Sequence, residues 1–231
     1  MKYSKLIASF AVAAMTFVLA MSQTTNVFLP NQLNEPHYTI IIDAGHGGVD
    51  GGATSCTGIY ESQINLEIAL RLDDLMHLFG YDTRMIRTTD ISVYTEGETI
   101  AAKKVSDLKH RVSLVNETNN GILVSIHQNQ FSDSRYSGAQ VFYSKNGQSK
   151  LLAEQLQSAF IADLNVGSSR MAKPANGIYL MEKITKPGVL IECGFLSNFK
   201  EEAALRDQKY QKKLCSVIAA TLSSYLGREV M

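Results

Sequence analysis

The sequence predicts an α/β domain whose largely parallel sheet is covered by helices on both faces. Two observations support this fold class. Short apolar runs rich in β-branched residues, such as 39–42 and 122–126, indicate strands that are buried on both sides. Between these runs, apolar residues recur every three or four positions, which is the spacing of one helix face. Strands that alternate in this way with helices are typical of parallel sheets.

The expected elements follow one another along the chain. Strands are predicted at 39–42, 82–88, 122–126, 139–143, 178–181 and 189–191. Four helices are predicted from apolar residues at helical spacing: Ile64, Ile68, Leu72, Leu75 and Phe79; Val105, Leu108, Val112 and Val115; Leu152, Leu156, Phe160 and Leu164; Leu214, Ile218, Leu222 and Tyr225. Gly80 stands where a glycine commonly ends a helix.

The first residues have the composition of an export signal. Lys2 and Lys5 precede an apolar run at 6–21, and Ala20-Met21-Ser22 resembles a signal-peptidase site. The run is shorter than the roughly 18 to 20 residues of a transmembrane helix. Residues 1–22 are therefore expected to be a signal peptide or an N-terminal anchor. Residues 23–37 are expected to be a spacer, and 38–231 the single catalytic domain.

Charge and cysteine content exclude several classes of protein. The 231 residues carry 22 Lys+Arg and 22 Asp+Glu, and without Lys2 and Lys5 the balance is 20 against 22. Such a balance argues against nucleic-acid binding, and membrane contact is expected only through the N-terminal segment. Three widely spaced cysteines do not form a disulfide framework.

Four polar residues share one predicted position in the fold. His46, His127 and Glu192 each follow a predicted strand, and Glu61 precedes the first long helix. Ligands of open α/β sheets bind outside the carboxyl ends of the strands, so these side chains could meet in one crevice. Two histidines and a carboxylate form a catalytic zinc set, and Glu192 could serve as a general base.

Each of these residues also has an ordinary structural interpretation. A histidine after a strand is more often a hydrogen-bonded structural residue, and Glu61 could simply stabilise a helix N-terminus. The loop at 43–52 contains five glycines, which allow tight turns and the close approach of other groups. It lacks the third glycine of a dinucleotide-binding loop, because Asp50 occupies that position. Spacing alone leaves the zinc site and its structural alternatives open.

Four segments in order resemble the zinc-dependent N-acetylmuramoyl-L-alanine amidases, over about residues 38–226. They are IIIDAGHGGVDGGA, YESQINLEIALRL, SIHQN and GVLIECGFLSN. The resemblance implies a mainly parallel six-stranded sheet flanked by helices. It implies hydrolysis of the amide between N-acetylmuramic acid and the L-alanine of the stem peptide. It also implies one zinc ion on His46, Glu61 and His127, with Glu192 as the catalytic carboxylate.

Further segments, among them TTDISVYTEG and GIYLMEKITKPG, resemble the spore-cortex amidases of endospore-forming bacteria, whose action prepares muramic δ-lactam. Arg111 and Asn116 match an Arg and an Asn of the family. Arg111 could bind a stem-peptide carboxylate or form a structural ion pair. Asn116 is expected to support a ligand indirectly, and Asn129 to contact substrate or orient His127. Ala44 and Gln128 depart from the family pattern without touching a ligand.

Two other functions remain as alternatives. The chain could be a non-catalytic wall-binding protein on the same fold, or a zinc peptidase that cuts within the stem peptide. Because no wall-anchoring repeat is recognised, a separate activating or positioning protein is expected. The expected location is outside the cytoplasm, in the cell wall or the forespore cortex.

Overall fold

The computed structural model describes residues 37–229. The predicted signal peptide or anchor at 1–22 and all of the predicted spacer except His37 lie outside the described residues. Among the residues that are described, no helix is both long enough and apolar enough to cross a membrane.

A six-stranded sheet forms the centre of the domain, with strand order β2-β1-β3-β6-β4-β5. The strands are β1 (Thr39–Ala44), β2 (Asp82–Met85), β3 (Gly121–Asn129), β4 (Gln140–Tyr143), β5 (Lys173–Pro174) and β6 (Gly188–Phe195). Strands β2, β1, β3 and β6 are parallel, whereas β4 is antiparallel to β6. The prediction of a mainly parallel six-stranded sheet is confirmed.

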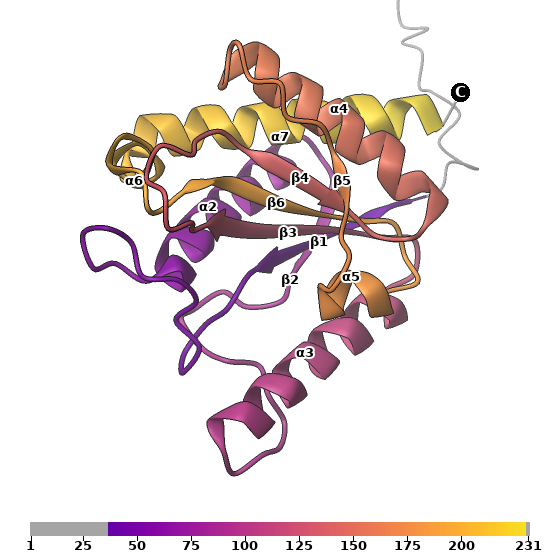
Figure 1. The fold of residues 1–231 in the computed structure, drawn as a ribbon. Helices are drawn as coiled ribbons and strands as arrows, with labels where there is room; N and C mark the ends of the chain where they lie inside the picture. Colours follow the sequence, from indigo (N-terminus) through magenta and orange to yellow (C-terminus); the bar gives the residue numbers. More distant parts are fainter. Residues whose placement is uncertain (1–36, 230–231) are drawn as a thin grey trace, which may run out of the picture. The chain divides into compact units, whose positions relative to one another are not determined.

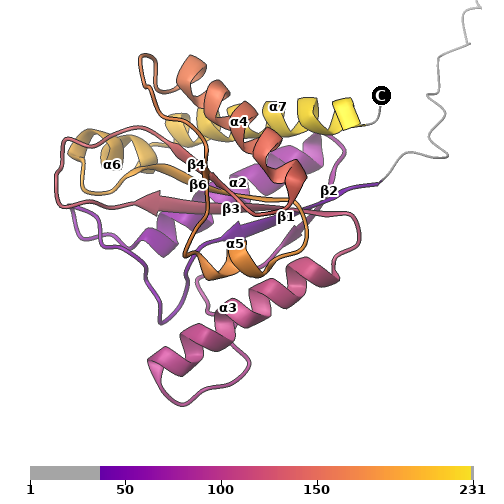
Figure 2. The same ribbon diagram turned by 45° about the vertical axis from the view of Figure 1, so that its right-hand side comes forward.

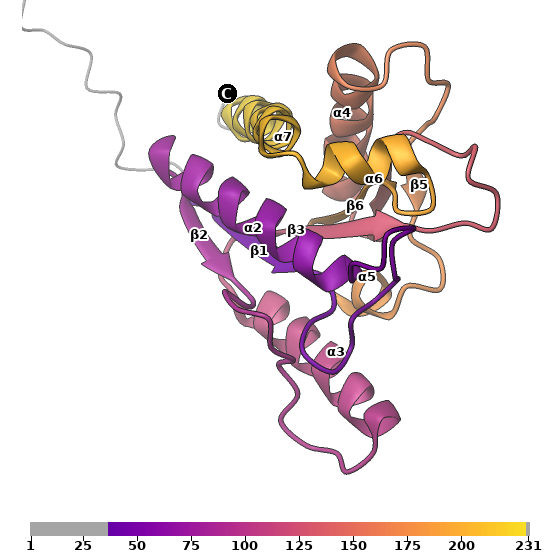
Figure 3. The ribbon, with the colours of Figure 1, turned by 90° about the vertical axis from the view of Figure 1, so that its left-hand side faces the viewer.

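Helices cover both faces of this sheet. They are α2 (Glu61–Leu78), α3 (Ile100–Glu117), α4 (Gly147–Asp163), α5 (Tyr179–Lys183), α6 (Phe199–Arg206) and α7 (Gln208–Glu229). Helices α2, α4, α6 and α7 lie on one face, and α3 and α5 lie on the other (Figures 1, 2 and 3). Alternate strand residues serve the two cores: Ile40 and Ile42 belong to the larger cluster, and Ile41 belongs to the smaller one with Val115 of α3.

The strand predicted at 178–181 is wrong, because these residues begin the short helix α5. Leu180, Met181 and Ile184 lie at helical spacing and pack in the smaller core, where they cover Leu123 and Leu190 of the sheet. A four-residue apolar run is too short for periodicity to distinguish a helix from a strand. The strand that completes the six-stranded sheet is instead β5 (Lys173–Pro174), which is exposed and has no run of apolar residues.

The register of the central strands determines where the polar residues meet. Ala44 pairs with Ile126, and His127 pairs with Glu192, so β1, β3 and β6 end at one edge of the sheet. Ile126 and Ile191 belong to the larger core. Since strand side chains alternate between faces, His127 and Glu192 both point to the face that carries α3 and α5.

Candidate metal centre

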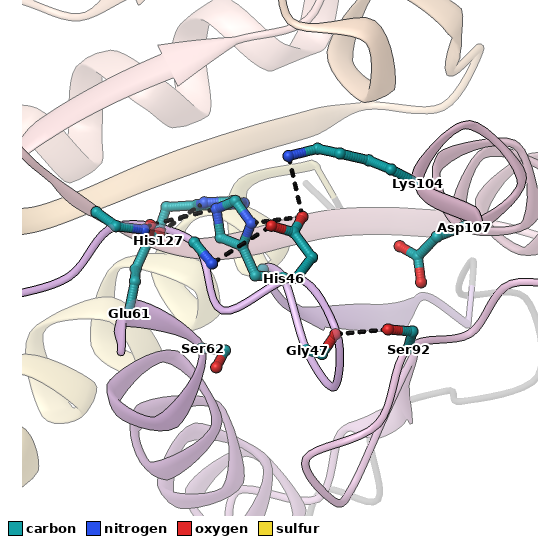
Figure 4. A network of polar contacts seen from close by, with 12 residues as sticks. His46, Gly47, Glu61, Ser62, Ser92, Lys104, Asp107 and His127 are labelled. Atoms are coloured by element: carbon teal, nitrogen blue, oxygen red, sulfur yellow. Dashed lines mark hydrogen bonds and ion pairs between the residues drawn. The ribbon is translucent and has the colours of Figure 1, made fainter. Parts of the chain in front are cut away.

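Three side chains from separate elements converge at this edge of the sheet. His46 follows β1, His127 lies near the end of β3, and Glu61 is the first residue of α2. Their potential ligand atoms all lie within 4.8 Å of one another, so the group could hold a metal ion. Glu61 Oε2 is 3.2 Å from His46 Nε2, and Glu61 Oε1 is 3.0 Å from His127 Nδ1 (Figure 4). Two imidazole nitrogens and one carboxylate oxygen match the donor set of catalytic zinc sites.

The Glu61 carboxylate is held in its charged form. Burial favours the neutral acid, but hydrogen bonds from His127 and His46 outweigh burial and hold the pKa of Glu61 well below its usual range. Oε1 also accepts from Asn65 Nδ2 and from the backbone N–H of Gln128, each at 3.1 Å, so the expectation that Gln128 touches no ligand is wrong for its backbone. The carboxylate is therefore both ionised and fixed in orientation, as a metal ligand must be.

Two glycines make room for the three candidate ligands. A Cβ atom at Gly45 would lie 2.2 Å from His127 Nε2. A Cβ at Gly52 would lie 2.6 Å from Glu61 Oε2. The backbone of Gly52 also has a φ of +69°, which residues with a side chain rarely adopt. The sequence indicated that something approaches this loop closely. In the structure, the groups that approach it include the side chains of the candidate ligands.

His46 has an unusual backbone conformation that neighbouring groups stabilise. Its φ is +61°, which is uncommon for a residue other than glycine and is found most often where the surroundings enforce it. Asp50 Oδ2 lies 2.9 Å from His46 Nδ1. Sequence reasoning missed this role of Asp50, although its position four residues after His46 in the glycine-rich loop was a usable signal.

Glu192 lies beside the three candidate ligands and is not one of that group. It pairs in register with His127 on the neighbouring strand, and its Oε2 is buried without a hydrogen-bond partner. Burial raises the pKa of Glu192 to about 7, against the opposing charge of His127. A carboxyl with a pKa near neutrality can take and release a proton at physiological pH.

The contacts of Arg111 match the structural alternative. Its guanidinium is buried, and all three of its nitrogens donate within the fold: to Asp43, to Asp107 at 2.6 Å, and to the backbone carbonyls of Ala44 and His46. Asp43 also accepts from Ser125 Oγ at 2.6 Å. Arg111 therefore holds the end of β1 and the loop that carries His46.

Asn116 and Asn129 lie at opposite ends of β3. The expectation that Asn116 supports a ligand is corrected, because its side chain bonds to Lys183 and Thr185. The reason is that α3 runs back to the start of β3, so its last turn lies at the opposite end of the strand from His127. Asn129 ends β3, where its carbonyl accepts from Leu196, and its role toward substrate stays a prediction.

The Asp43–Arg111 pair leads to a stability prediction. Burial raises the pKa of Asp43, but chiefly the charge of Arg111 brings it below its usual value. The pair therefore contributes its full stability above about pH 4, which is near the pKa of an Asp in an unfolded chain. This contribution is lost as the pH falls through the lower pKa of Asp43 in the folded protein. We expect Arg111→Met to reduce the free energy of unfolding of the metal-free protein by about 3–5 kcal/mol at pH 7, measured by urea denaturation.

The same variant has a pH signature. Without Arg111, burial raises the pKa of Asp43 above its unfolded value, so the buried carboxylate opposes folding at neutral pH. The deficit should shrink toward pH 4, where Asp43 takes up a proton. A double variant that also carries Asp43→Asn should recover part of the loss. A deficit that does not change between pH 7 and pH 4 would contradict this account.

Comparisons with known proteins identify the family of this chain. The N-acetylmuramoyl-L-alanine amidase family matches residues 40–224. The germination-specific N-acetylmuramoyl-L-alanine amidase of Bacillus subtilis (strain 168) is 38% identical over 188 residues, which cover 80% of this chain and 78% of the relative.

Solved structures show the same fold. The CwlD amidase from Clostridioides difficile, in complex with the GerS lipoprotein, is similar at a TM-score of 0.79 and 39% identity, covering 83% of this chain and 99% of that one. An N-acetylmuramoyl-L-alanine amidase from Clostridium difficile 630 gives 0.72 at 31% identity, covering 84% and 98%. The chain therefore belongs to the N-acetylmuramoyl-L-alanine amidase family.

Proposed function

We propose that His46, Glu61 and His127 hold one zinc ion, and that the site cleaves the amide between N-acetylmuramic acid and L-alanine in peptidoglycan. The observation that carries this proposal is the convergence of the three ligand candidates beside the buried, unpartnered oxygen of Glu192. A zinc ion at this place would polarise the amide carbonyl and lower the pKa of a water molecule.

The protein's own residues supply the proton transfer. Glu192 accepts a proton from the attacking water and returns it to the alanine nitrogen as the amide bond breaks. Its position one strand from His127 brings it close to the metal without competing for it. Glu61 contributes the negative charge of the ligand set, and Asn65 and the Gln128 amide keep its carboxylate in place.

The biological setting is part of the proposal. The Bacillus subtilis relative is named for germination, and the Clostridioides difficile structure contains a lipoprotein. Together with the export signal predicted at the N-terminus, these relatives support a role outside the cytoplasm, in spore-cortex peptidoglycan. They also support a separate protein that positions or activates the enzyme.

The test combines metal analysis with product identification. The purified protein is expected to contain one zinc per chain and to release stem peptides with a free L-alanine amine from peptidoglycan, read by mass spectrometry. A chelator should abolish release, and added zinc should restore it, because the metal is needed for the chemistry. New termini within the stem peptide would instead indicate a peptidase. Zinc binding without any release, even from cortex peptidoglycan and with the partner protein supplied, would support a wall-binding protein.

A further inference from the structure

A lysine from α3 reaches the support of the metal site. Lys104 Nζ lies 3.1 Å from Asp50 Oδ2, and the same oxygen lies 2.9 Å from His46 Nδ1 (Figure 4). The other oxygen of Asp50 accepts from the Gly52 N–H at 3.4 Å. An ammonium, a carboxylate and an imidazole thus form a series of contacts from helix α3 to a candidate ligand.

This series of contacts determines which nitrogen of His46 would be available to a metal ion. A neutral imidazole carries its proton on one nitrogen and offers a lone pair on the other. With a metal bound, the carboxylate beside Nδ1 would keep the ring proton there and leave the lone pair of Nε2, which lies on the Glu61 side of the ring, for the ion. The Lys104 ammonium, 3.1 Å from Asp50 Oδ2, holds that carboxylate in place beside the His46 ring through a charge-assisted hydrogen bond.

Helix α3 also holds the backbone of the same residue. Arg111, two turns after Lys104, donates to the carbonyl of His46 at 2.8 Å. His46 has a φ of +61°, a conformation that costs energy for a residue other than glycine. One helix therefore contacts His46 in two ways: directly at its carbonyl through Arg111, and through Asp50 at its ring.

We propose that Lys104 is a positioning residue for the metal centre, which acts through Asp50 on the ring of His46. The proposal rests on the proposed function and deepens it at the same site. If the role of Lys104 were purely structural, its removal would instead lower the stability of the metal-free protein. The Lys104 side chain is 52% exposed, and an exposed ion pair contributes little to folding. Its removal should therefore change metal binding and leave the stability of the metal-free protein nearly unchanged.

The neighbouring lysine provides a matched control. Lys103 lies with its Nζ 5.0 Å from the centre of the Tyr94 ring and has no ion pair with Asp50 among the described contacts. Lys104→Met and Lys103→Met make the same change in net charge, one position apart on one helix. The zinc dissociation constant of each full-length variant is measured by competition with a chelator. The absorption spectrum of the cobalt(II) form reports the ligand geometry, and thermal unfolding of the metal-free protein reports stability.

Lys104→Met is expected to weaken zinc binding about 10-fold and to alter the cobalt spectrum, with Lys103→Met close to the wild type. Asp50→Asn should weaken zinc binding by about 10- to 100-fold. In the Asp50→Asn background, Lys104→Met should have no further effect, because its route to His46 is already broken.

The outcomes separate this proposal from the proposed function. Equal zinc affinities for the Lys104 and Lys103 variants would overturn the role of Lys104, even if the wild type cleaves peptidoglycan as proposed. If Lys104→Met weakens zinc binding by the same factor in the Asp50→Asn background as in the wild type, the route through Asp50 is overturned. A wild type that binds zinc but does not cleave would overturn the proposed function alone, and one that binds no zinc would overturn both.

Discussion

Replacing Glu192 by Gln is expected to lower the turnover of peptidoglycan about 10²- to 10⁴-fold, which is the usual contribution of a general base. The amide has nearly the same size as the carboxyl but cannot take up the proton. Because Glu192 is not among the grouped ligand candidates, zinc content should remain one per chain. Steady-state release of stem peptides and elemental analysis of the same sample give the two readouts.

A distant carboxylate provides the control for this substitution. Glu154 of α4 is exposed, and Glu154→Gln makes the same change in charge away from the crevice. It should retain wild-type turnover. Turnover of Glu192→Gln within about twofold of the wild type would remove Glu192 from the mechanism, and loss of zinc from this variant would show that it helps to bind the metal.

Gly45→Ala is expected to disable the metal centre without unfolding the domain. The added methyl group would lie 2.2 Å from His127 Nε2, so the ring must leave its present position beside Glu61. A displacement of about 1 Å at a catalytic group can cost about 100-fold in rate. We therefore expect turnover to fall at least about 100-fold and zinc to bind more weakly, measured by product release and chelator competition.

Gly147→Ala is the matched control, since nothing lies within 4 Å of the Cβ that it would add at the start of α4. Both variants should show the far-ultraviolet circular dichroism of the wild type. Normal zinc affinity in Gly45→Ala would mean that His127 can retain its place beside a side chain, contrary to the steric argument.

The four residues of the site could be predicted because they stand at the ends of recognisable elements. The apolar runs before His127 and Glu192 mark buried strands, and parallel strands end at one edge of a sheet. His77 and His110, by contrast, lie within helices α2 and α3. Resemblance to the family then favoured ligation over the structural alternatives.

The supporting residues could not be found in this way. Asp50, Lys104 and Arg87 have no periodic signal. The Arg87 guanidinium donates to the carbonyls of Ala44, Gly45 and Ser62, which are distant in the sequence. The strand predicted at 178–181 failed for a related reason: Leu180 and Met181 are apolar in either conformation, and only the sheet residues that they cover decide between helix and strand.

Local hydrophobic pattern and strand direction are properties of short segments, so they were enough to predict the fold class, the central strands and the four residues that could meet near the strand ends. Which groups hold those residues in place follows from tertiary packing. Whether Arg111 faces Asp43 or a substrate, and whether Lys104 reaches Asp50, depends on how α3 packs across the sheet edge. Such contacts join segments tens of residues apart, and no local pattern encodes them.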